Sequence, residues 1–321
     1  MIAIQQGWSM ASDVSERLPA AHLGMLLWAV IVGLSFPAVK LMSEGLPPLS
    51  LTALRFSIAA LSMVPLMRTE APGWPSARGF MLYAAMGLCL AGFFGTMFWA
   101  AHRVTALSMA ALYVTVPLLA YCLGRGIGVE PRAGRLLAVL VLGASGALAL
   151  ALAQAGGRVA DLQFGLGEFG FFLGCISSAL YPVLSKWGLR HGTFSGGSTP
   201  RTFWSLLAGA IVVGLMALIF ERPEQLVRMT FMDLLLVVYL GVVSSGVTFW
   251  IMQRATAVLS PAAVTAYSYL VPFVSMLILF IEYPERAGWQ WLPGSLTVVI
   301  AIALLLRLRP APQTGPQTGR R

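Results

Sequence analysis

Ten apolar stretches separated by short polar joints make up the pattern of this chain. A bilayer core about 30 Å thick needs about 20 mostly apolar residues per helix, and ten stretches meet or approach that length. They cover residues 23–42, 49–67, 80–101, 105–123, 136–153, 166–188, 202–220, 231–253, 260–281 and 289–306. The joints carry turn-forming residues such as Pro72-Gly73 and Glu130-Pro131. The pattern predicts an all-α membrane protein with ten transmembrane helices.

Two short motifs occur twice, which indicates an internal repeat. They are Pro117 with Glu130 and Pro272 with Glu285, 13 residues apart in each pair, and Phe36-Pro37 with Tyr181-Pro182. We therefore expect a first five-helix repeat over residues 21–154 and a second over 163–308. Since five is odd, the second repeat must enter the membrane upside-down, as in carriers built from inverted repeats. Residues 1–20 are expected to form an N-terminal tail, and 309–321, rich in Pro, Gly, Gln and Arg, a disordered tail.

Composition agrees with a membrane location. Apolar residues make up 58% of the chain and charged residues 10%, whereas soluble domains hold about 25% charged residues. The net charge of +9 would be compatible with nucleic-acid binding, but the basic residues stand singly in short loops, so no nucleic-acid partner is expected. The three cysteines, Cys89, Cys122 and Cys175, lack metal-ligand or disulfide spacing. We expect them to be buried, and we expect no metal or cofactor and no signal peptide.

The Lys and Arg residues predict the orientation in the membrane. With both termini in the cytoplasm, 14 of the 21 fall on the inner side and two, Lys40 and Arg55, fall within helices. The outer loops then hold five, which are Arg103, Arg158, Arg222, Arg228 and Arg286. Because cytoplasmic loops are enriched in Lys and Arg, both termini are predicted to be cytoplasmic.

Several segments resemble the EamA-type transporters of the drug/metabolite transporter superfamily. They are SFPAVK at 35–40, PLSLTALRF at 48–56, AALYVTVP at 110–117, FW at 249–250 and AVLSPA at 257–262. One departure is the extra glutamate Glu282 and a proline ahead of Glu285, so the second family-type glutamate is either Glu282 or Glu285. The spacing from Pro272 favours Glu285. The resemblance covers residues 22–306 and implies ten helices as two inverted five-helix repeats. It further implies a multi-pass carrier of the bacterial inner (plasma) membrane that exports amino acids or related small metabolites. Helices 1, 3, 4, 6, 8 and 9 would line its central cavity.

Polar and aromatic residues within those helices are the candidate substrate-binding residues. They are Trp28, Phe94, Trp99, Tyr113, Thr115, Ser178, Tyr181, Ser245, Phe249, Trp250, Tyr267 and Tyr269, together with Arg55 in the second helix. The aromatic rings are suited to stacking on a substrate, although an interfacial aromatic belt is the alternative. Arg55 is costly inside a membrane, so it either contacts a substrate carboxylate or helix-end carbonyls, or extends to the interface.

The ends and breaks of the helices also carry candidate roles. Glu130 and Glu285 are predicted to cap the helix that follows each of them, with a gating ion pair as the alternative. Prolines inside apparent helices are expected to kink them and shape the cavity; they are Pro37, Pro117, Pro182, Pro261 and Pro272. None of the twelve acidic residues lies in the middle third of a span. This favours facilitated diffusion or exchange over proton coupling.

Other function classes find little support. The chain has no His-Glu-x-x-His or Gly-x-Ser-x-Gly motif, so an intramembrane enzyme is disfavoured, and a channel would need rings of charge or carbonyl groups. The prediction is a transporter of a small molecule in a lipid bilayer. Export of amino acids or related metabolites is preferred, and efflux of xenobiotics or lipophilic cations is the alternative. The sequence leaves open the substrate, the direction, the energy coupling and the oligomeric state.

Overall fold

Within the described part of the chain, ten helices are long and apolar enough to cross a membrane, as the hydrophobic pattern predicts. The computed structural model describes residues 2–70, 73–194 and 196–308, with side chains from Arg17 onward. The long helices are α1 (Ile2–Lys40), α2 (Pro48–Glu70), α3 (Ala77–Ala101), α6 (Gly134–Gln154), α7 (Leu166–Arg190), α8 (Ser198–Phe220) and α13 (Leu292–Arg307). The predicted disordered tail at 309–321 lies outside the described residues.

Three of the ten spans are broken into shorter helices. The fourth span consists of α4 (Ala106–Tyr113) and α5 (Val116–Gly126). The eighth consists of α9 (Phe231–Tyr239), a π-helical segment (Leu240–Val247) and α10 (Thr248–Val258). The ninth consists of α11 (Pro261–Ala266), a 3-10 turn (Tyr267–Tyr269) and α12 (Leu270–Glu282).

Proline explains two of these breaks. Pro117 lies at the start of α5, directly after the break in the fourth span, and Pro272 lies just after the 3-10 turn in the ninth. A proline lacks the backbone N–H that would continue the helix, so both breaks fall where the sequence predicts a kink. The prediction for Pro261 is wrong, because Pro261 occupies the first turn of α11 rather than a helix interior. First-turn proline is well tolerated.

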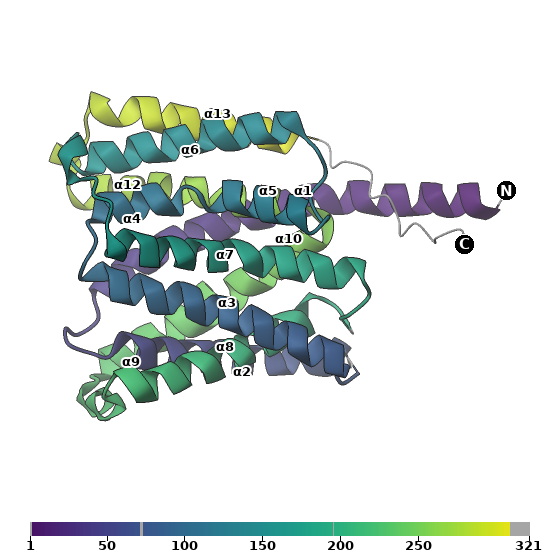
Figure 1. Ribbon diagram of the computed structural model, residues 1–321, viewed down its shortest axis with the longest axis horizontal. Helices are drawn as coiled ribbons and strands as arrows, with labels where there is room; N and C mark the ends of the chain where they lie inside the picture. Colours follow the sequence, from purple (N-terminus) through teal and green to yellow (C-terminus); the bar gives the residue numbers. More distant parts are fainter. Residues whose placement is uncertain (1, 71–72, 195, 309–321) are drawn as a thin grey trace.

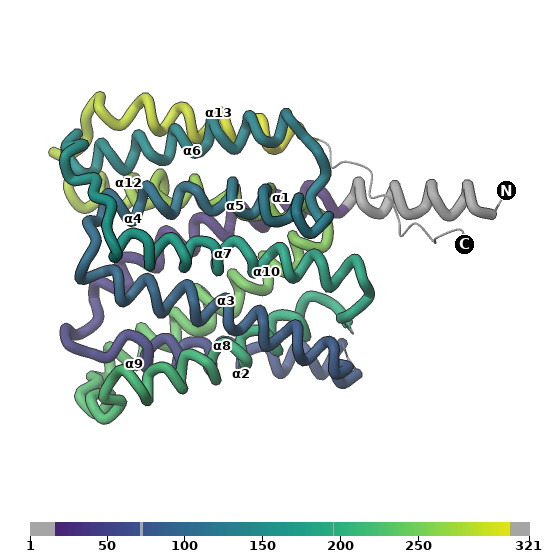
Figure 2. Tube along the Cα trace, viewed as in Figure 1, coloured from purple at the N-terminus to yellow at the C-terminus, as the bar shows by residue number. Residues whose placement is uncertain are grey.

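The helices run back and forth between two faces, shown in Figure 1 and traced in Figure 2. We call the face with Arg17 of α1 and the end of α13 the terminal face, and the opposite one the distal face. α5, α10 and α11 are the halves of the broken spans at the terminal face, and α4, α9 and α12 are the halves at the distal face. α6 and α13 lie side by side at one edge of the molecule, and α2, α8 and α9 lie at the other.

Glycines allow the closest helix contacts. A Cβ added to Gly87 of α3 would stand 2.6 Å from the carbonyl carbon of Ala208 in α8. A Cβ added to Gly146 of α6 would stand 2.8 Å from the backbone nitrogen of Val298 in α13. Lipid chains are as apolar as leucine, so membrane helices associate through close packing at small residues. These glycines therefore position the helices around the centre.

The helix pairs follow a simple exchange rule between the two halves of the chain. Replacing each span by the one five places later converts the α3–α7 pair into α10–α1, and the α5–α7 pair into α12–α1. It also converts α3–α8 into the packing of the eighth span on α2. The pairs α2–α8 and α6–α13 are converted into themselves. In these pairs, spans five places apart in the chain make matching contacts.

Candidate functional site

An arginine inside the second span forms the polar centre of the candidate site. Arg55 lies seven residues into α2, about 10 Å below its first residue. Its Nε donates to Ser245 Oγ at 2.7 Å, and its Nη2 donates to Ser244 Oγ at 3.3 Å. Both serines belong to the π-helical segment, which contacts α2 closely through Gly241. Two of the predicted site residues, Arg55 and Ser245, are therefore in direct contact.

No carboxylate balances the Arg55 charge within the part of the chain that the structure describes. The side chain is half-buried. It is affected by the loss of solvation on burial, and no charged group among the described residues offsets that loss. Its guanidinium carbon lies 6.0 Å from the centre of the Phe94 ring, at the outer limit of a cation–π contact. A cation held by two neutral hydroxyls and an aromatic ring is able to bind an anion.

The Phe94 ring beside Arg55 belongs to a series of contacting aromatic rings. The Phe56 ring makes edge-to-face contacts with Phe94 at 5.2 Å and with Phe249 at 6.1 Å between centroids. Phe249 makes a further edge-to-face contact with Tyr181 at 5.4 Å. The rings of Phe94, Tyr181 and Phe249, all predicted site residues, thus form one cluster, which contains the unpredicted Phe56. We call these four residues the aromatic cluster.

A buried polar network begins at the far end of the aromatic cluster. Tyr181 Oη is 2.8 Å from Ser205 Oγ and accepts from Gln253 Nε2 at 2.9 Å. Gln253 Oε1 accepts from Ser185 Oγ at 2.6 Å. Arg201 donates to the Gln253 carbonyl at 2.9 Å. The sequence analysis predicted only Tyr181 of this network. Gln253, a polar amide at the end of an apolar stretch, is the residue from which a buried polar contact could have been predicted.

The basic residues of this network correct a sequence assignment. Lys186 and Arg201 count as loop residues in the sequence, but they lie within α7 and α8 and are only 4% exposed each. Lys186 Nζ donates to the carbonyls of Thr256 and Ala257 at 2.9 and 3.2 Å. These carbonyls belong to the last turn of α10, where a cation is favourable.

Four further candidates belong to the fourth, sixth and eighth spans, and among the described residues none of them makes a contact with Arg55. Tyr113 is half-buried beside Phe93, with ring centroids 5.7 Å apart. The Thr115 hydroxyl donates a hydrogen bond to the Leu112 carbonyl at the break of the fourth span. Ser178 is half-buried on α7. The Trp250 indole donates to Thr199 Oγ1 at 3.2 Å.

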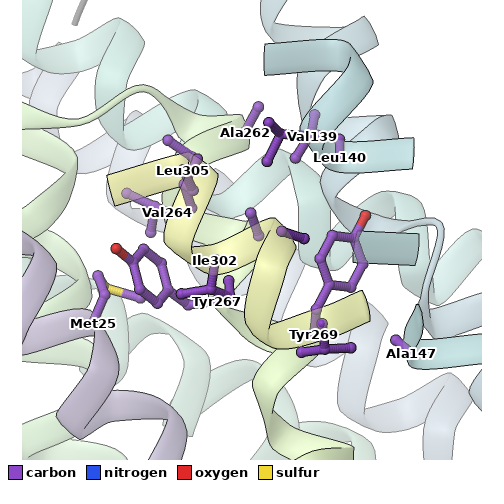
Figure 3. Close-up of a cluster of buried hydrophobic side chains, with 14 of the residues drawn as sticks. Met25, Val139, Leu140, Ala147, Ala262, Val264, Tyr267, Tyr269, Ile302 and Leu305 are labelled. Atoms are coloured by element: carbon purple, nitrogen blue, oxygen red, sulfur yellow. The ribbon is translucent and has the colours of Figure 1, made fainter. Parts of the chain in front are cut away.

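Four candidates lie apart from the Arg55 centre. Trp99 is 42% exposed at the end of α3, with Arg103 over its ring. Trp28 packs against the largest core cluster. In that cluster, shown in Figure 3, Tyr267 lies beside Met25, and Tyr269 turns toward the element carrying Ala147. Tyr267 Oη is 2.6 Å from His22 Nδ1, and the Tyr269 ring fills the space beside Gly143.

A cavity of about 210 Å³ lies at the distal face between the ends of α1, α6 and α12. Its polar lining consists of Lys40, Gln154, Ser275 and Glu282, and it also touches Phe36 and Trp291.

Within residues 2–70, 73–194 and 196–308, no three His, Cys, Asp or Glu side chains lie together as a metal site requires. Cys89 and Cys175 are buried as expected, but Cys122 is exposed, which contradicts that expectation.

Glutamates at helix ends fasten helices that are distant in the sequence. Glu221, at the end of α8, accepts from the backbone N–H groups of Leu49 and Ser50 at 2.7 and 2.8 Å. Glu70, at the end of α2, accepts reciprocally from Thr199 Oγ1 in the first turn of α8, at 2.5 Å. These two helices belong to different halves of the chain and cap each other.

Glu130 follows the same principle and corrects a prediction. Its Oε2 accepts from the backbone N–H of Ala262 at 3.1 Å. Ala262 lies in the first turn of α11, so Glu130 caps the start of the ninth span rather than the helix that follows it in sequence. The sequence gives the residue and the capping role, but its partner lies 132 residues away.

Comparison with known proteins agrees with this architecture. The EamA-like transporter family matches the chain twice, over residues 19–152 and 165–307. Similar proteins include an uncharacterized transporter, YcxC, of Bacillus subtilis, 23% identical over 90% of this chain and 93% of its own length. They also include an uncharacterized inner membrane transporter, YedA, of Escherichia coli K12, 25% identical over 88% and 90%.

A solved crystal structure resembles the fold with a TM-score of 0.71. It is 18% identical and covers 90% of this chain and 96% of its own. A likeness at this identity shows the fold alone. Together with the double family match and the ten membrane-crossing helices, it leaves one conclusion. The chain is a multi-pass membrane protein that belongs to the EamA-like transporter family.

Proposed function

We propose that this protein exports small metabolites, amino acids or related carboxylates, across a bacterial inner membrane by alternating access at the Arg55 centre. Family membership already implies a small-molecule substrate and a lipid bilayer. The substrate class, the direction and the residues of the site are our proposal. Arg55 is the anchor for the substrate carboxylate, and the aromatic cluster and Tyr113 contact its apolar part.

The uncompensated charge of Arg55 is the observation that carries this proposal. A cation at membrane depth costs several kcal/mol unless it is paired. The described residues supply two hydroxyls and no carboxylate near Arg55. A substrate carboxylate supplies the missing charge and fits the planar donor fork of a guanidinium. The same charge opposes lipophilic cations, so the observation favours metabolites over xenobiotic cations.

The arrangement of helices supports alternating access. The fourth and ninth spans are equivalent in the two halves. Their contact at the terminal face is α5 with α11, and the equivalent contact at the distal face would be α12 with α4. α5 and α11 pack together extensively, whereas α4 and α12 are not among the extensively packed pairs of the described chain. The distal cavity lies beside α12. From this difference in packing we infer that the molecule is closed at the terminal face and open at the distal face, as expected of one state in the cycle of an inverted-repeat carrier.

The membrane orientation follows from the basic residues. The terminal face carries most of the Lys and Arg residues, and cytoplasmic loops are enriched in these residues. YedA of Escherichia coli, a similar protein, is called an inner membrane transporter. We accordingly place the terminal face in the cytoplasm, which makes the described state open to the outside.

Counterflow in proteoliposomes tests this function. Vesicles loaded with unlabelled amino acids receive labelled threonine, cysteine or phenylalanine outside, with and without a pH gradient. We expect accumulation without a gradient. Arg55→Ala should reduce the rate at least about tenfold, because a hydrogen bond to a charged group contributes about 1.5–3 kcal/mol. Arg228→Ala, at a distal loop outside the site, is the matched control and should transport normally.

Two outcomes would contradict the proposal in different ways. Silence for every amino acid, with folded protein in the vesicles, would exclude this substrate class. Accumulation that survives Arg55→Ala would exclude Arg55 as the carboxylate anchor. Uptake that requires the pH gradient would overturn facilitated diffusion or exchange as the mode of transport, while leaving the substrate class intact.

A further inference from the structure

A buried carboxylate lies between the two halves of the chain at the terminal face, where α5 packs against α11. We propose that Glu130 is a gate residue, whose hydrogen bond to Ala262 keeps α5 against α11 and must break before the terminal face opens. This inference rests on the alternating-access part of the proposed function and does not depend on the substrate. We call Glu130, Lys186, Arg190 and Ala262 the gate residues.

Glu130 is placed where the two halves meet. It follows α5 of the first half, and its side chain is 3% exposed. Its Oε2 accepts from Ala262 N–H, and the Ser260 hydroxyl also interacts with the carboxylate. Its Oε1 is buried without a hydrogen-bond partner among the described residues. A buried carboxylate with this few partners is stable only while the surrounding helices stay together.

A second contact fastens the same loop to α7. Arg190 Nη1 donates to the Gly128 carbonyl at 2.7 Å. Lys186, one turn earlier on α7, holds the last carbonyls of α10. Both cations act on the Glu130 carboxyl across the interface. The loop at 127–130 is therefore held by the sixth span through Arg190 and by the ninth span through Ala262. The contact with the ninth span is the one that must break when the terminal face opens.

The equivalent glutamate at the open face has no such contact. Glu285 follows Pro272 by 13 residues, as Glu130 follows Pro117. Glu285 is exposed, and among the residues that the structure describes its carboxylate makes no hydrogen bond. The glutamate is thus bonded where the face is closed and unbonded where the face is open. This difference between equivalent positions is what a gate residue requires and what a purely structural cap does not explain.

Cysteine accessibility tests the gate without any substrate. The background carries Cys89→Ala, Cys122→Ala and Cys175→Ala. The inner reporter is Ala120→Cys in α5, a fully buried position packed with Ala179 and Val183 of α7. The outer reporter is Ser275→Cys in the distal cavity. Each is labelled with a membrane-impermeant maleimide, the inner one in inside-out vesicles and the outer one in right-side-out vesicles.

Opposite changes at the two reporters are the expected result. Glu130→Ala should raise the labelling rate of the inner reporter about tenfold and lower that of the outer one, since loss of the acceptor for Ala262 N–H shifts the population toward the terminal-open state. Glu130→Gln keeps an oxygen that accepts from Ala262 N–H and is neutral like the protonated acid, so its inner labelling should stay unchanged or fall. Glu285→Ala, the matched control, should leave inner labelling unchanged or lower.

Three results would overturn the gate. Unchanged inner labelling in Glu130→Ala would show that the hydrogen bond does not hold the face closed. A parallel rise at both reporters would show that Glu130 only stabilises the fold. An equal effect of Glu285→Ala would remove its specificity for the terminal face. Because labelling needs no transport, failed counterflow with a positive labelling result would reject the amino-acid substrate and leave the gate standing.

Discussion

At the scale of single residues, the candidate site is a short list of polar contacts in an apolar surrounding. Arg55 is visible in the sequence, because a charge within an apolar helix is rare. Its partner Ser245 is 190 residues away and lies on another span. The same is true of Glu130 and Ala262. Each prediction at this scale concerns one such pair.

Ser245→Ala should weaken substrate binding with little effect on folding. The substitution removes the acceptor of Arg55 Nε, so the guanidinium loses the contact that orients it. Hydrogen bonds to charged groups contribute about 1.5–3 kcal/mol, and we expect the KM of counterflow to rise about tenfold. Ser57→Ala, whose hydroxyl bonds only to the Ala53 carbonyl of its own helix, is the control. Equal KM values for the two variants would argue against an oriented Arg55.

Acid on the terminal side should favour the closed gate. Burial raises the pKa of the Glu130 carboxyl above its usual range, and hydrogen bonds from Ser260 and Ala262 and the charges of Lys186 and Arg190 only partly oppose this. Opening would return the group to water and to its ordinary pKa, so the closed state binds the proton more tightly. Protonation therefore stabilises the closed state, and this stabilisation is lost as the pH rises through the raised pKa.

The labelling of Ala120→Cys measures this dependence. Corrected for the intrinsic reactivity of the maleimide, its rate in inside-out vesicles should fall as the pH on the terminal side drops from neutral to about 5. The pH dependence should disappear in Glu130→Gln, which cannot ionise. A pH profile that persists in that variant would assign the effect to another group.

At the scale of helices, glycine decides how closely the spans approach. Gly87 brings α3 against the backbone of α8 at Ala208 and Gly209.

Breaks within the spans also shape the packing of the helices. Pro117 and Pro272 mark breaks at equivalent places of the fourth and ninth spans, while the π-helical segment of the eighth span has no proline and was not predicted. Its hydrogen-bond shift lets Gly241 and Ser245 face α2 together.

Gly87→Ala should destabilise the protein by about 1–3 kcal/mol, the usual cost of overpacking. The added methyl group would meet backbone atoms at 2.6–2.7 Å, and backbone cannot move aside as a flexible side chain does. The measurement is the loss of helical circular dichroism on heating in detergent. Gly134→Ala, with nothing within 4 Å of the added atom, should keep or slightly raise the Tm. The packing argument fails if both variants melt alike.

At the scale of the whole molecule, the fold combines a repeated unit with one asymmetry. Most of the large contacts have a counterpart between equivalent spans, but α5–α11, α7–α10 and α7–α11 lack one among the extensively packed pairs of the described residues. The reciprocal caps of Glu70 and Glu221 join α2 to α8 at both faces, so these helices are held in the same way at each end. The contacts that distinguish the two faces are made by α5, α7, α10 and α11 at the terminal face.

The orientation of the molecule gives a direct prediction. In the cysteine-free background, Val227→Cys, 90% exposed at the distal face, should react with an impermeant maleimide on intact cells. Trp74→Cys, 81% exposed at the terminal face, should react only after the membrane is permeabilised. The physical reason is the excess of Lys and Arg at the terminal face, which is retained in the cytoplasm. The reverse labelling pattern would invert the orientation and would exchange inside and outside in the transport cycle.

The sequence by itself determined the number of spans, the all-helical class and the doubling of the unit. Each of these depends on local composition: a run of about 20 apolar residues must become a helix in a bilayer, because no other structure there satisfies its backbone. Lone polar residues such as Arg55 and Glu130 were visible for the same reason. The tertiary structure alone decided which residues they meet, since those partners come from distant spans. It also decided that Trp99 and Tyr269 lie apart from the centre and that one face is closed, because packing between helices sets both.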